Sequence, residues 1–383
     1  MRNSMESPAG TTLDPAEQPW SVRKAPLLKS VLDEGPDVIG FQEPRLEGQR
    51  DDIMNGLKTA YACTSQSISQ GGEVSAVDSC RPIGTAGALA EVTHALVVRP
   101  TVAPDFLLNW KFFVQSIMLS VGRVELVKEE HFWLSQTPDV AYSRGWDAAD
   151  VRMAIIGTFK LKNSKEVFRV VNTHFDWVGT KFKTEAVKLI LERIRKSVSE
   201  KASTSSLDDS LVFLVGDFNS EASEPAYSLI TTSSNSSFVD LRKGSQDENV
   251  PTWVEYSAAG KPYYPDMTID YIFGAAAAVS TDASGKEVSM VPISETKCKV
   301  ESVTVVDNEF ELPAGEQQAN STAGEGGKFR YSDHRIFSPP LYTPLSSIPI
   351  SSSSHPHLDG KQASKRASAA AATRIDTKQG LEQ

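Results

Sequence analysis

Three short apolar segments, each ending on a polar side chain, constrain the fold of this 383-residue chain more than any other feature. They end on Glu43, His174 and Asp217, and they span residues 37–43, 168–174 and 211–217. Runs of this length that are rich in Val, Ile, Leu and Phe predict buried β-strands. Enzymes that combine helices with sheets place reactive groups at strand ends and in the loops that follow. We therefore expect a functional site where these strands end.

Helix-like periodicity accompanies the predicted strands. Between residues 174 and 211, apolar residues recur at every fourth position and predict one face of a helix of about five turns. The residues on this face are Phe182, Ala186, Ile190, Ile194 and Val198. An amphipathic stripe from Val22 to Leu32 stops at Gly35-Pro36, a pair that ends helices. The alternation of the two patterns predicts an α/β fold.

Composition limits the classes of function and the compartment. The chain has 49 acidic and 39 basic side chains, and its net charge of −10 argues against coating of nucleic acid by charge alone. Its three cysteines lack Cys-x-x-Cys spacing, which excludes a zinc ribbon and favours a reducing compartment. No apolar run at the start resembles a signal peptide, and polar residues interrupt the hydrophobic stretch 106–119. We expect a cytoplasmic protein with no membrane span and no obligate protein partner.

The pattern along the chain predicts one large domain with unstructured ends. Residues 1–16 are polar and contain no apolar run, so we expect them to be disordered. The alternating pattern fills residues 17–338. Residues 339–383 are rich in Ser, Pro and Ala, and no aromatic residue follows Tyr342. Such a tail buries too little apolar area to offset its ordering entropy, so it is also predicted to be disordered.

Five short polar motifs lie at or near the ends of apolar runs. Taken singly, most of them have an ordinary structural interpretation, such as a surface carboxylate at a strand end or a hydrogen-bonded loop histidine. Gly216-Asp-Phe-Asn219 is more specific, because two short polar residues flank an aromatic residue at a strand end. The other four are Gln42-Glu43, Asn172-Thr-His174, Ile269-Asp-Tyr-Ile-Phe273 and Ser332-Asp-His334.

In their order along the chain, the five motifs resemble the endonuclease/exonuclease/phosphatase superfamily, which includes deoxyribonucleases, inositol polyphosphate 5-phosphatases and deadenylases. Residues 17–23 and 132–138 are similar to a microbial and fungal branch of it. The resemblance implies a four-layer αββα sandwich, in which two mixed β-sheets pack together between helices. It also implies hydrolysis of phosphate esters, and thus a phosphate-ester substrate. A sugar, inositol or nucleotide phosphate and a nucleic acid remain open as substrates.

The resemblance also assigns roles at a metal site. Hydrolysis of a phosphate ester needs a hydroxide-like nucleophile and neutralisation of charge on the phosphoryl oxygens. Glu43 and Asp333 would bind Mg²⁺, or Mn²⁺ in its place, because hard cations prefer oxygen ligands. Asp217 would accept the proton of the attacking water, and Asn219 would orient that water or the phosphate. Alternatively, Asp217 and Asn219 would hold a second metal ion.

Three further side chains complete the implied site. His334 would lie against the scissile phosphate, while Asp270 accepts a hydrogen bond from its other ring nitrogen. His174 would donate to a non-bridging phosphate oxygen. Arg152 resembles a phosphate-contacting arginine of the family, with a surface salt bridge at a strand start as the equal alternative.

Two departures from the family pattern support rival interpretations. Family members begin with an apolar strand that ends in an asparagine ligand, and this strand is missing from residues 1–16. Residues 61–123 diverge from the pattern and are interpreted as an unspliced segment. Such losses would permit a catalytically impaired interaction protein or indicate a defective gene model. Among active enzymes, a 3'-5' exoribonuclease of the carbon-catabolite-repressor deadenylase type is the alternative to a general phosphodiesterase or phosphatase.

Overall fold

The structure is a computed structural model. It describes residues 19–42, 49–63, 67–70, 73–76, 116–162, 166–199, 211–233, 236–254, 266–282, 285–295, 298–299, 303–306, 309–311, 328–330, 334–338 and 343–344. The chain divides into two units, Met1–Thr343 and Pro344–Gln383, and the fold below is that of the first.

A seven-stranded mixed sheet is the centre of the fold. Its strands follow the order β10-β11-β9-β8-β7-β6, and β12 also pairs with β11. Only β8 and β9 run parallel, while the other pairs are antiparallel. The strand bounds are β6 Val124–Trp133, β7 Met153–Leu161, β8 Val167–His174, β9 Leu211–Asp217, β10 Val239–Asp240, β11 Asp270–Asp282 and β12 Gly285–Pro292.

A smaller antiparallel sheet has the strand order β1-β5-β2. Its strands are β1 Val38–Phe41, β2 Tyr61–Cys63 and β5 Ser116–Ser120. Separate short pairs are formed by β3 with β4, β14 with β17 and β15 with β16. The remaining short strands are β3 Ser67–Gln70, β4 Glu73–Ala76, β13 Cys298–Lys299, β14 Thr304–Val306, β15 Glu309–Glu311, β16 Lys328–Arg330, β17 Ile336–Ser338 and β18 Thr343–Pro344.

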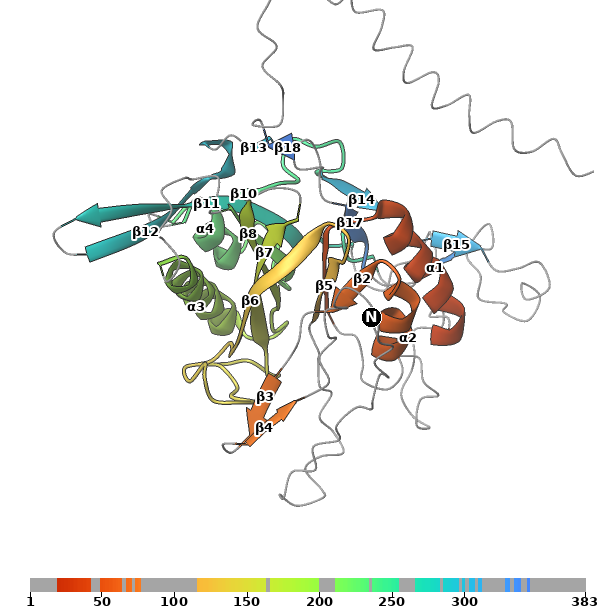
Figure 1. The fold of residues 1–383 in the computed structure, drawn as a ribbon, viewed down its shortest axis with the longest axis horizontal. Helices are drawn as coiled ribbons and strands as arrows, with labels where there is room; N and C mark the ends of the chain where they lie inside the picture. The colour runs from red at the N-terminus through yellow and green to blue at the C-terminus, as the bar shows by residue number, and fades with distance from the viewer. Residues whose placement is uncertain are drawn as a thin grey trace, which may run out of the picture. The chain divides into compact units, whose positions relative to one another are not determined.

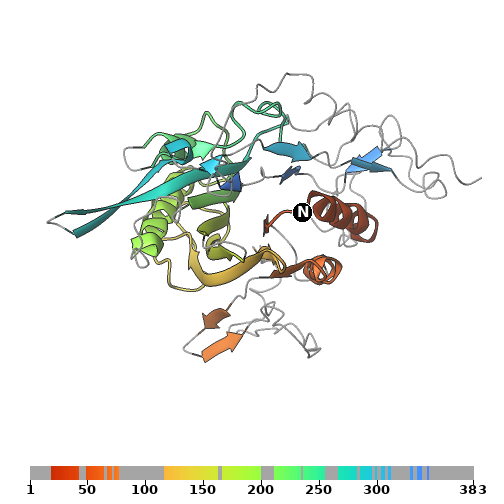
Figure 2. The same ribbon diagram turned by 45° about the horizontal axis from the view of Figure 1, so that its top comes forward.

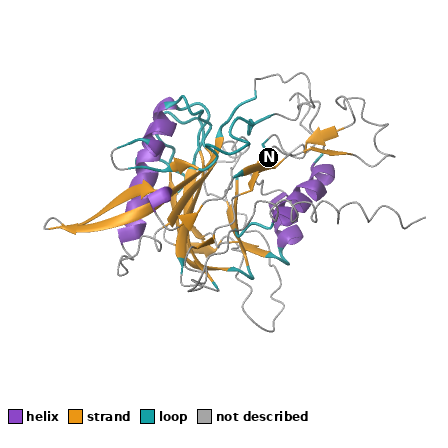
Figure 3. Cartoon of the chain, turned by 90° about the horizontal axis from the view of Figure 1, so that it is seen from above, coloured by secondary structure: helices purple, strands orange, loops and turns teal. Residues whose placement is uncertain are grey.

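Helices cover the outer faces of both sheets (Figures 1 and 3). α3 and α4 pack on the large sheet through one apolar cluster, and α1 and α2 pack on the small sheet through another. The helices are α1 Trp20–Glu34, α2 Gln49–Leu57, α3 Thr180–Ser199 and α4 Pro225–Thr231, and a 3-10 turn spans Ile293–Glu295. No helix in the described part of the chain is long and apolar enough to cross a membrane.

The inner faces of the two sheets form a third apolar cluster. Ile117 and Leu119 of β5 pack there against Ile155 and Phe159 of β7 and Val170 of β8. Because side chains alternate along a strand, one face of each sheet serves this inner layer and the other serves the helices. Figure 2 shows the two sheets with their helices from a second direction. The predicted αββα sandwich is therefore confirmed.

Local sequence explains the helix that connects the parallel strands. All five apolar residues predicted to form one face of the helix after His174 are buried in α3. This face lies on the large sheet, so α3 is the crossover that allows β8 and β9 to run parallel. α1 ends as predicted, because Gly35 adopts a left-handed φ of 56° and its N–H donates to the carbonyl of Val31.

The predicted boundaries of the domain stay predictions. Residues 1–18 lie outside the described residues, and so does the tail beyond residue 338 except for β18. In the divergent interval 61–123, the two ends form β2 and β5 of the small sheet. Most residues between them lie outside the described part, so its interpretation as an unspliced segment also stays a prediction.

Candidate active site

One edge of the large sheet carries four of the predicted site residues on four consecutive strands. Arg152 directly precedes β7, His174 ends β8, Asp217 ends β9 and Asp270 begins β11. The register places His174 opposite Asp217, and Asp217 opposite Asp270. Paired positions on neighbouring strands project to the same face of a sheet, so these side chains converge. The ends of β8 and β9 and the beginnings of β7 and β11 thus place the four residues in one row.

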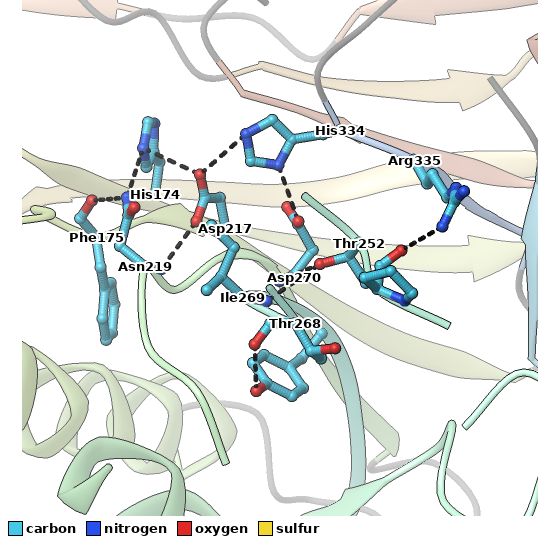
Figure 4. Close-up of polar contacts among 12 residues, drawn as sticks. His174, Phe175, Asp217, Asn219, Thr252, Thr268, Ile269, Asp270, His334 and Arg335 are labelled. Carbon is cyan, nitrogen blue, oxygen red and sulfur yellow. Dashed lines mark hydrogen bonds and ion pairs between the residues drawn. The ribbon is translucent and has the colours of Figure 1, made fainter. Parts of the chain in front are cut away.

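His334 joins this row from a segment 64 residues further along the chain than Asp270. Its Nδ1 lies 2.9 Å from Oδ2 of Asp270, and its Nε2 lies 3.8 Å from Oδ2 of Asp217 (Figure 4). The imidazole therefore lies between two carboxylates. A carboxylate at Nδ1 fixes the ring orientation and leaves Nε2 facing the centre of the cluster.

The turn after β9 holds Asp217 and Asn219 in fixed positions. The Asn219 N–H donates to Oδ1 of Asp217 at 2.8 Å, a local bond typical of aspartate turns. Asn219 itself has a positive φ of 44°, which asparagine tolerates better than most residues. Between the two, Phe218 is buried and packs its ring against Phe175. The aromatic residue anchors the turn, so both polar side chains project into the site.

The position directly before Asp217 requires glycine, and Gly216 occupies it. Its φ is 141°, a conformation that side chains rarely adopt. A Cβ at this position would lie 1.9 Å from the carbonyl oxygen of Thr173. The absence of a side chain therefore allows β8 and β9 to approach each other directly beside His174 and Asp217.

His174 is a buried histidine with two polar neighbours at Nε2. The Nδ2 group of Asn219 is 3.1 Å away and Oδ2 of Asp217 is 3.4 Å away. Burial lowers the pKa of His174 well below 6.5, and the positive charge of Arg152 and the neighbouring His334 lower it further. The ring is therefore neutral at neutral pH, and it can donate one N–H or accept at Nε2 according to its tautomer.

Arg152 is buried, so its interpretation as a surface residue is wrong, although its Nη2 does lie 3.9 Å from Oδ2 of partly exposed Asp150 just before β7. Its side chain is only 2% exposed, and its Nε lies 3.8 Å from Oδ2 of fully buried Asp176. Asp176 accepts backbone N–H groups of Asp150, Val178 and Gly179 at 2.8 to 3.0 Å. Burial by itself would raise the pKa of the Asp176 carboxyl, but these hydrogen bonds keep it below its usual value. A carboxylate that is ionised at neutral pH thus accompanies the buried guanidinium.

The predicted metal ligands Glu43 and Asp333 lie outside the described residues. Among the residues that are described, Asp217, Asp270 and His334 present ligand atoms that all lie within 4.8 Å of one another. Both carboxylates are buried, and two buried carboxylates side by side repel each other unless a cation or proton accompanies them. Their oxygen atoms suit a hard divalent cation, so the residues present fit the metal that the fold implies.

Comparison with known proteins now decides the family. The profile of the Endonuclease/Exonuclease/phosphatase family matches residues 13–334. The chain belongs to this family. No curated protein sequence matches it at a significant level.

Three solved structures share the fold of this family member. A Bacteroides thetaiotaomicron mannosyl-6-phosphatase is 19% identical with a TM-score of 0.57, covering 85% of this chain and 92% of that chain. An endonuclease/exonuclease/phosphatase from Bacteroides vulgatus is 22% identical with a TM-score of 0.52 and the same coverage. D. rerio TDP2 complexed with a single-strand DNA product is 14% identical with a TM-score of 0.50, covering 87% and 96%.

In this family member, Asn172 connects the two sheets beneath the row. The side chain of Gln42 donates to Oδ1 of Asn172 at 2.6 Å, and Nδ2 of Asn172 donates to the carbonyl of Phe41 at 3.1 Å. Gly40 permits this approach, since a Cβ there would lie 2.8 Å from Oδ1 of Asn172. The motifs Gln42-Glu43 and Asn172-Thr-His174 are therefore in contact. The contact is made by Gln42, the residue directly before Glu43.

Two buried polar residues that support the site, Asp176 and Thr252, were not among the predicted residues. Asp176 follows His174 by two positions and could have been found as an aspartate next to a predicted motif. Thr252 is also buried, and it hydrogen-bonds to the backbone at the start of β11 (Figure 4). Its surroundings, Val250-Pro-Thr-Trp253, carry no local pattern that indicates a site.

Proposed function

We propose that this protein is a metal-dependent hydrolase of phosphate esters that uses an activated water. The observation that carries the proposal is the row of Arg152, His174, Asp217 and Asp270 along one sheet edge, completed by His334. A base, hydrogen-bond donors and a buried cationic group lie together there, as attack of water on a phosphate requires. Family membership supports the same chemistry.

Asp217 is the proposed general base. Its Oδ1 is occupied by the Asn219 amide, so Oδ2 is the oxygen that faces both histidines. A carboxylate that is held in this way accepts the proton of the attacking water without reorienting. Asn219 is placed beside it to orient the water or a phosphate oxygen through its side-chain amide.

His334, His174 and Arg152 are the proposed phosphate-binding groups. Asp270 holds Nδ1 of His334, so Nε2 is directed at the site and can stabilise charge on the leaving oxygen. His174 donates to a non-bridging oxygen when its Nε2 carries the proton and no longer accepts from Nδ2 of Asn219. Arg152 supplies a fixed positive charge behind His174, which its electrostatic effect on the His174 pKa supports.

Glu43 and Asp333 are the proposed ligands of Mg²⁺ or Mn²⁺, with the carboxylates of Asp217 and Asp270 as the adjacent oxygen donors. When bound, the cation would neutralise negative charge on the phosphoryl oxygens. Asp270 has a second function in this proposal, because it also orients His334. The arrangement argues against the alternative of an inert interaction protein, since buried His174, Asp217 and Asp270 lie together with partly exposed His334.

A compact phosphate ester, such as a sugar, inositol or nucleotide phosphate, is the proposed substrate. The net charge of −10 favours a small ester over a long nucleic acid, which a basic surface would bind. The fold accommodates either, since its solved relatives include a mannosyl-6-phosphatase and a TDP2 bound to DNA product.

Hydrolysis of p-nitrophenyl phosphate and of bis-p-nitrophenyl phosphate, each with and without Mg²⁺, tests the proposal. Release of nitrophenol from the monoester alone would identify a phosphatase, and release from the diester would identify a phosphodiesterase. A folded protein that hydrolyses neither substrate nor any sugar or nucleotide phosphate would support the inert interaction protein instead.

A further inference from the structure

The Asp270–His334 pair joins two segments that are distant in sequence, and a third segment lies between their backbones. Thr252 and Trp253 form this bridge, because Trp253 makes isolated β-bridges with both Met267 and His334. Figure 4 shows Thr252 between the start of β11 and the His334-Arg335 segment. The geometry of the pair therefore depends on this intervening segment.

Thr252 makes hydrogen bonds to both sides of the bridge. Its Oγ1 accepts the backbone N–H groups of Ile269 and Asp270, each at 3.1 Å. Its backbone carbonyl accepts the N–H of Arg335 at 2.8 Å. Thr252 has no exposed surface, so water does not compete for these bonds. The side-chain oxygen of Thr252 thus fixes the backbone of Asp270. Its backbone carbonyl fixes Arg335, the neighbour of His334.

The carboxylate of Asp270 follows its backbone, because a short side chain has few rotamers with which to compensate for a shift. Removal of Oγ1 would leave two buried N–H groups without their acceptor, and the start of β11 would move to find another. Such movement would change the 2.9 Å contact between Asp270 and Nδ1 of His334. A displacement of about 1 Å in a catalytic group is enough to lower turnover strongly.

We propose that Thr252 is a positioning residue that holds the Asp270–His334 pair in its catalytic geometry. The inference rests on the proposed hydrolase function, and it adds a residue that touches neither substrate nor metal. Arg335 belongs to the same arrangement, because its Nη1 donates to the carbonyl of Pro251 at 2.9 Å. The bridge is thereby attached to the His334 segment at two points.

Thr252→Val tests the proposal, because valine has nearly the same shape and lacks the acceptor oxygen. We expect kcat to fall about 10-fold to 100-fold with KM within twofold, the range found when residues behind a metal or catalytic ligand are removed. The pH–rate profile should change at the same time. Thr252→Ser keeps Oγ and should retain kcat within about threefold.

Thr158→Val is the matched control. Thr158 is a fully buried threonine of β7 whose hydroxyl has no hydrogen-bond partner within the described part of the chain. Its replacement removes a hydroxyl from the same sheet, yet kcat and the pH–rate profile should stay unchanged. If Thr252→Val does not fold, Thr252→Ala is used, since alanine also lacks the acceptor oxygen and places no methyl group against the two amides.

The readouts separate positioning from simple stability. A Thr252→Val or Thr252→Ala protein that melts at lower temperature but keeps the wild-type kcat and pH–rate profile would overturn the proposal. Loss of the Nδ1–H tautomer preference of His334, measured by histidine ¹⁵N NMR, would support it. An inactive wild-type enzyme would instead defeat the proposed function, and the NMR comparison would still test the positioning role.

Discussion

Asp217 and Asp270 occupy directly paired positions on the antiparallel strands β9 and β11, and the ring of His334 lies against both carboxylates. Two buried carboxylates in this arrangement cannot both keep their charge without a positive partner. The pairing therefore accounts for the histidine beside them and for the affinity for a divalent cation that we propose. It is set by backbone register, so it does not depend on flexible loops.

Both site histidines should be needed for turnover. We expect His174→Ala and His334→Ala each to lower kcat about 100-fold or more, because each removes a hydrogen-bonding group from the proposed phosphate site. Steady-state kinetics on a nitrophenyl ester measure the effect, with circular dichroism to verify folding. His131→Ala is the control, since His131 lies on β6 opposite Ile155 and outside the cluster. Wild-type turnover in both site variants would exclude the assignment.

Stability should fall on acidification because of His174. Its pKa in the folded protein lies below the value of 6.5 expected when unfolded, so the unfolded chain binds more protons below about pH 6.5. The contribution of His174 is complete above that pH and is lost as the pH falls toward the lowered pKa. We expect the unfolding free energy of His174→Gln to change less between pH 7.5 and 5.5 than that of the wild type. Chemical denaturation at the two pH values measures both changes. Equal changes would indicate that His174 is not a buried neutral histidine.

Gly216 should tolerate no side chain. Gly216→Ala would place a Cβ 1.9 Å from the Thr173 carbonyl at a φ of 141°. Backbone strain and overpacking each cost about 1–3 kcal/mol, so we expect a loss of about 2–6 kcal/mol in unfolding free energy. Gly122→Ala is the matched control, because its Cβ would meet nothing within 4 Å. We expect that variant to change stability by less than about 0.5 kcal/mol. Similar melting of both variants would contradict this packing.

Removal of divalent metal should abolish turnover. After treatment with EDTA, we expect activity to return on addition of Mg²⁺ or Mn²⁺, because the carboxylate cluster needs a counter-charge to bind a phosphate. Glu43→Gln should raise the Mg²⁺ concentration for half-maximal activity about 10-fold or more, measured by titration. Glu125→Gln on β6 is the control, because this carboxylate is exposed and pairs opposite Lys160 at the other end of the sheet. Full activity in metal-free buffer would refute the metal assignment.

Sequence alone predicted the elements whose signals are local. The face of α3 follows from apolar residues at every fourth position, and the ends of β8 and β9 follow from apolar runs that stop at polar residues. The αββα arrangement required more, namely the order of five motifs and their resemblance to a known superfamily. Periodicity does not specify which sheet faces which.

The supporting residues could not be predicted, because tertiary contacts define them. The sequence left open whether Arg152 forms a surface salt bridge. Its burial beside Asp176 is a tertiary contact that no local pattern reports. Thr252 bonds to amides 17 and 18 residues away, a separation at which no local pattern reports a contact. The link between Gln42 and Asn172 spans 130 residues, and it exists because the two sheets pack together.

The most direct test of the central claim compares the wild type with Asp217→Asn on the same phosphate ester in the presence of Mg²⁺. The wild type should hydrolyse the ester, and the variant should retain the fold but lose about 100-fold or more in kcat, because the amide cannot accept the proton of water. Equal turnover by the two proteins would contradict the proposal that the paired strand ends of the large sheet form a phosphoesterase site.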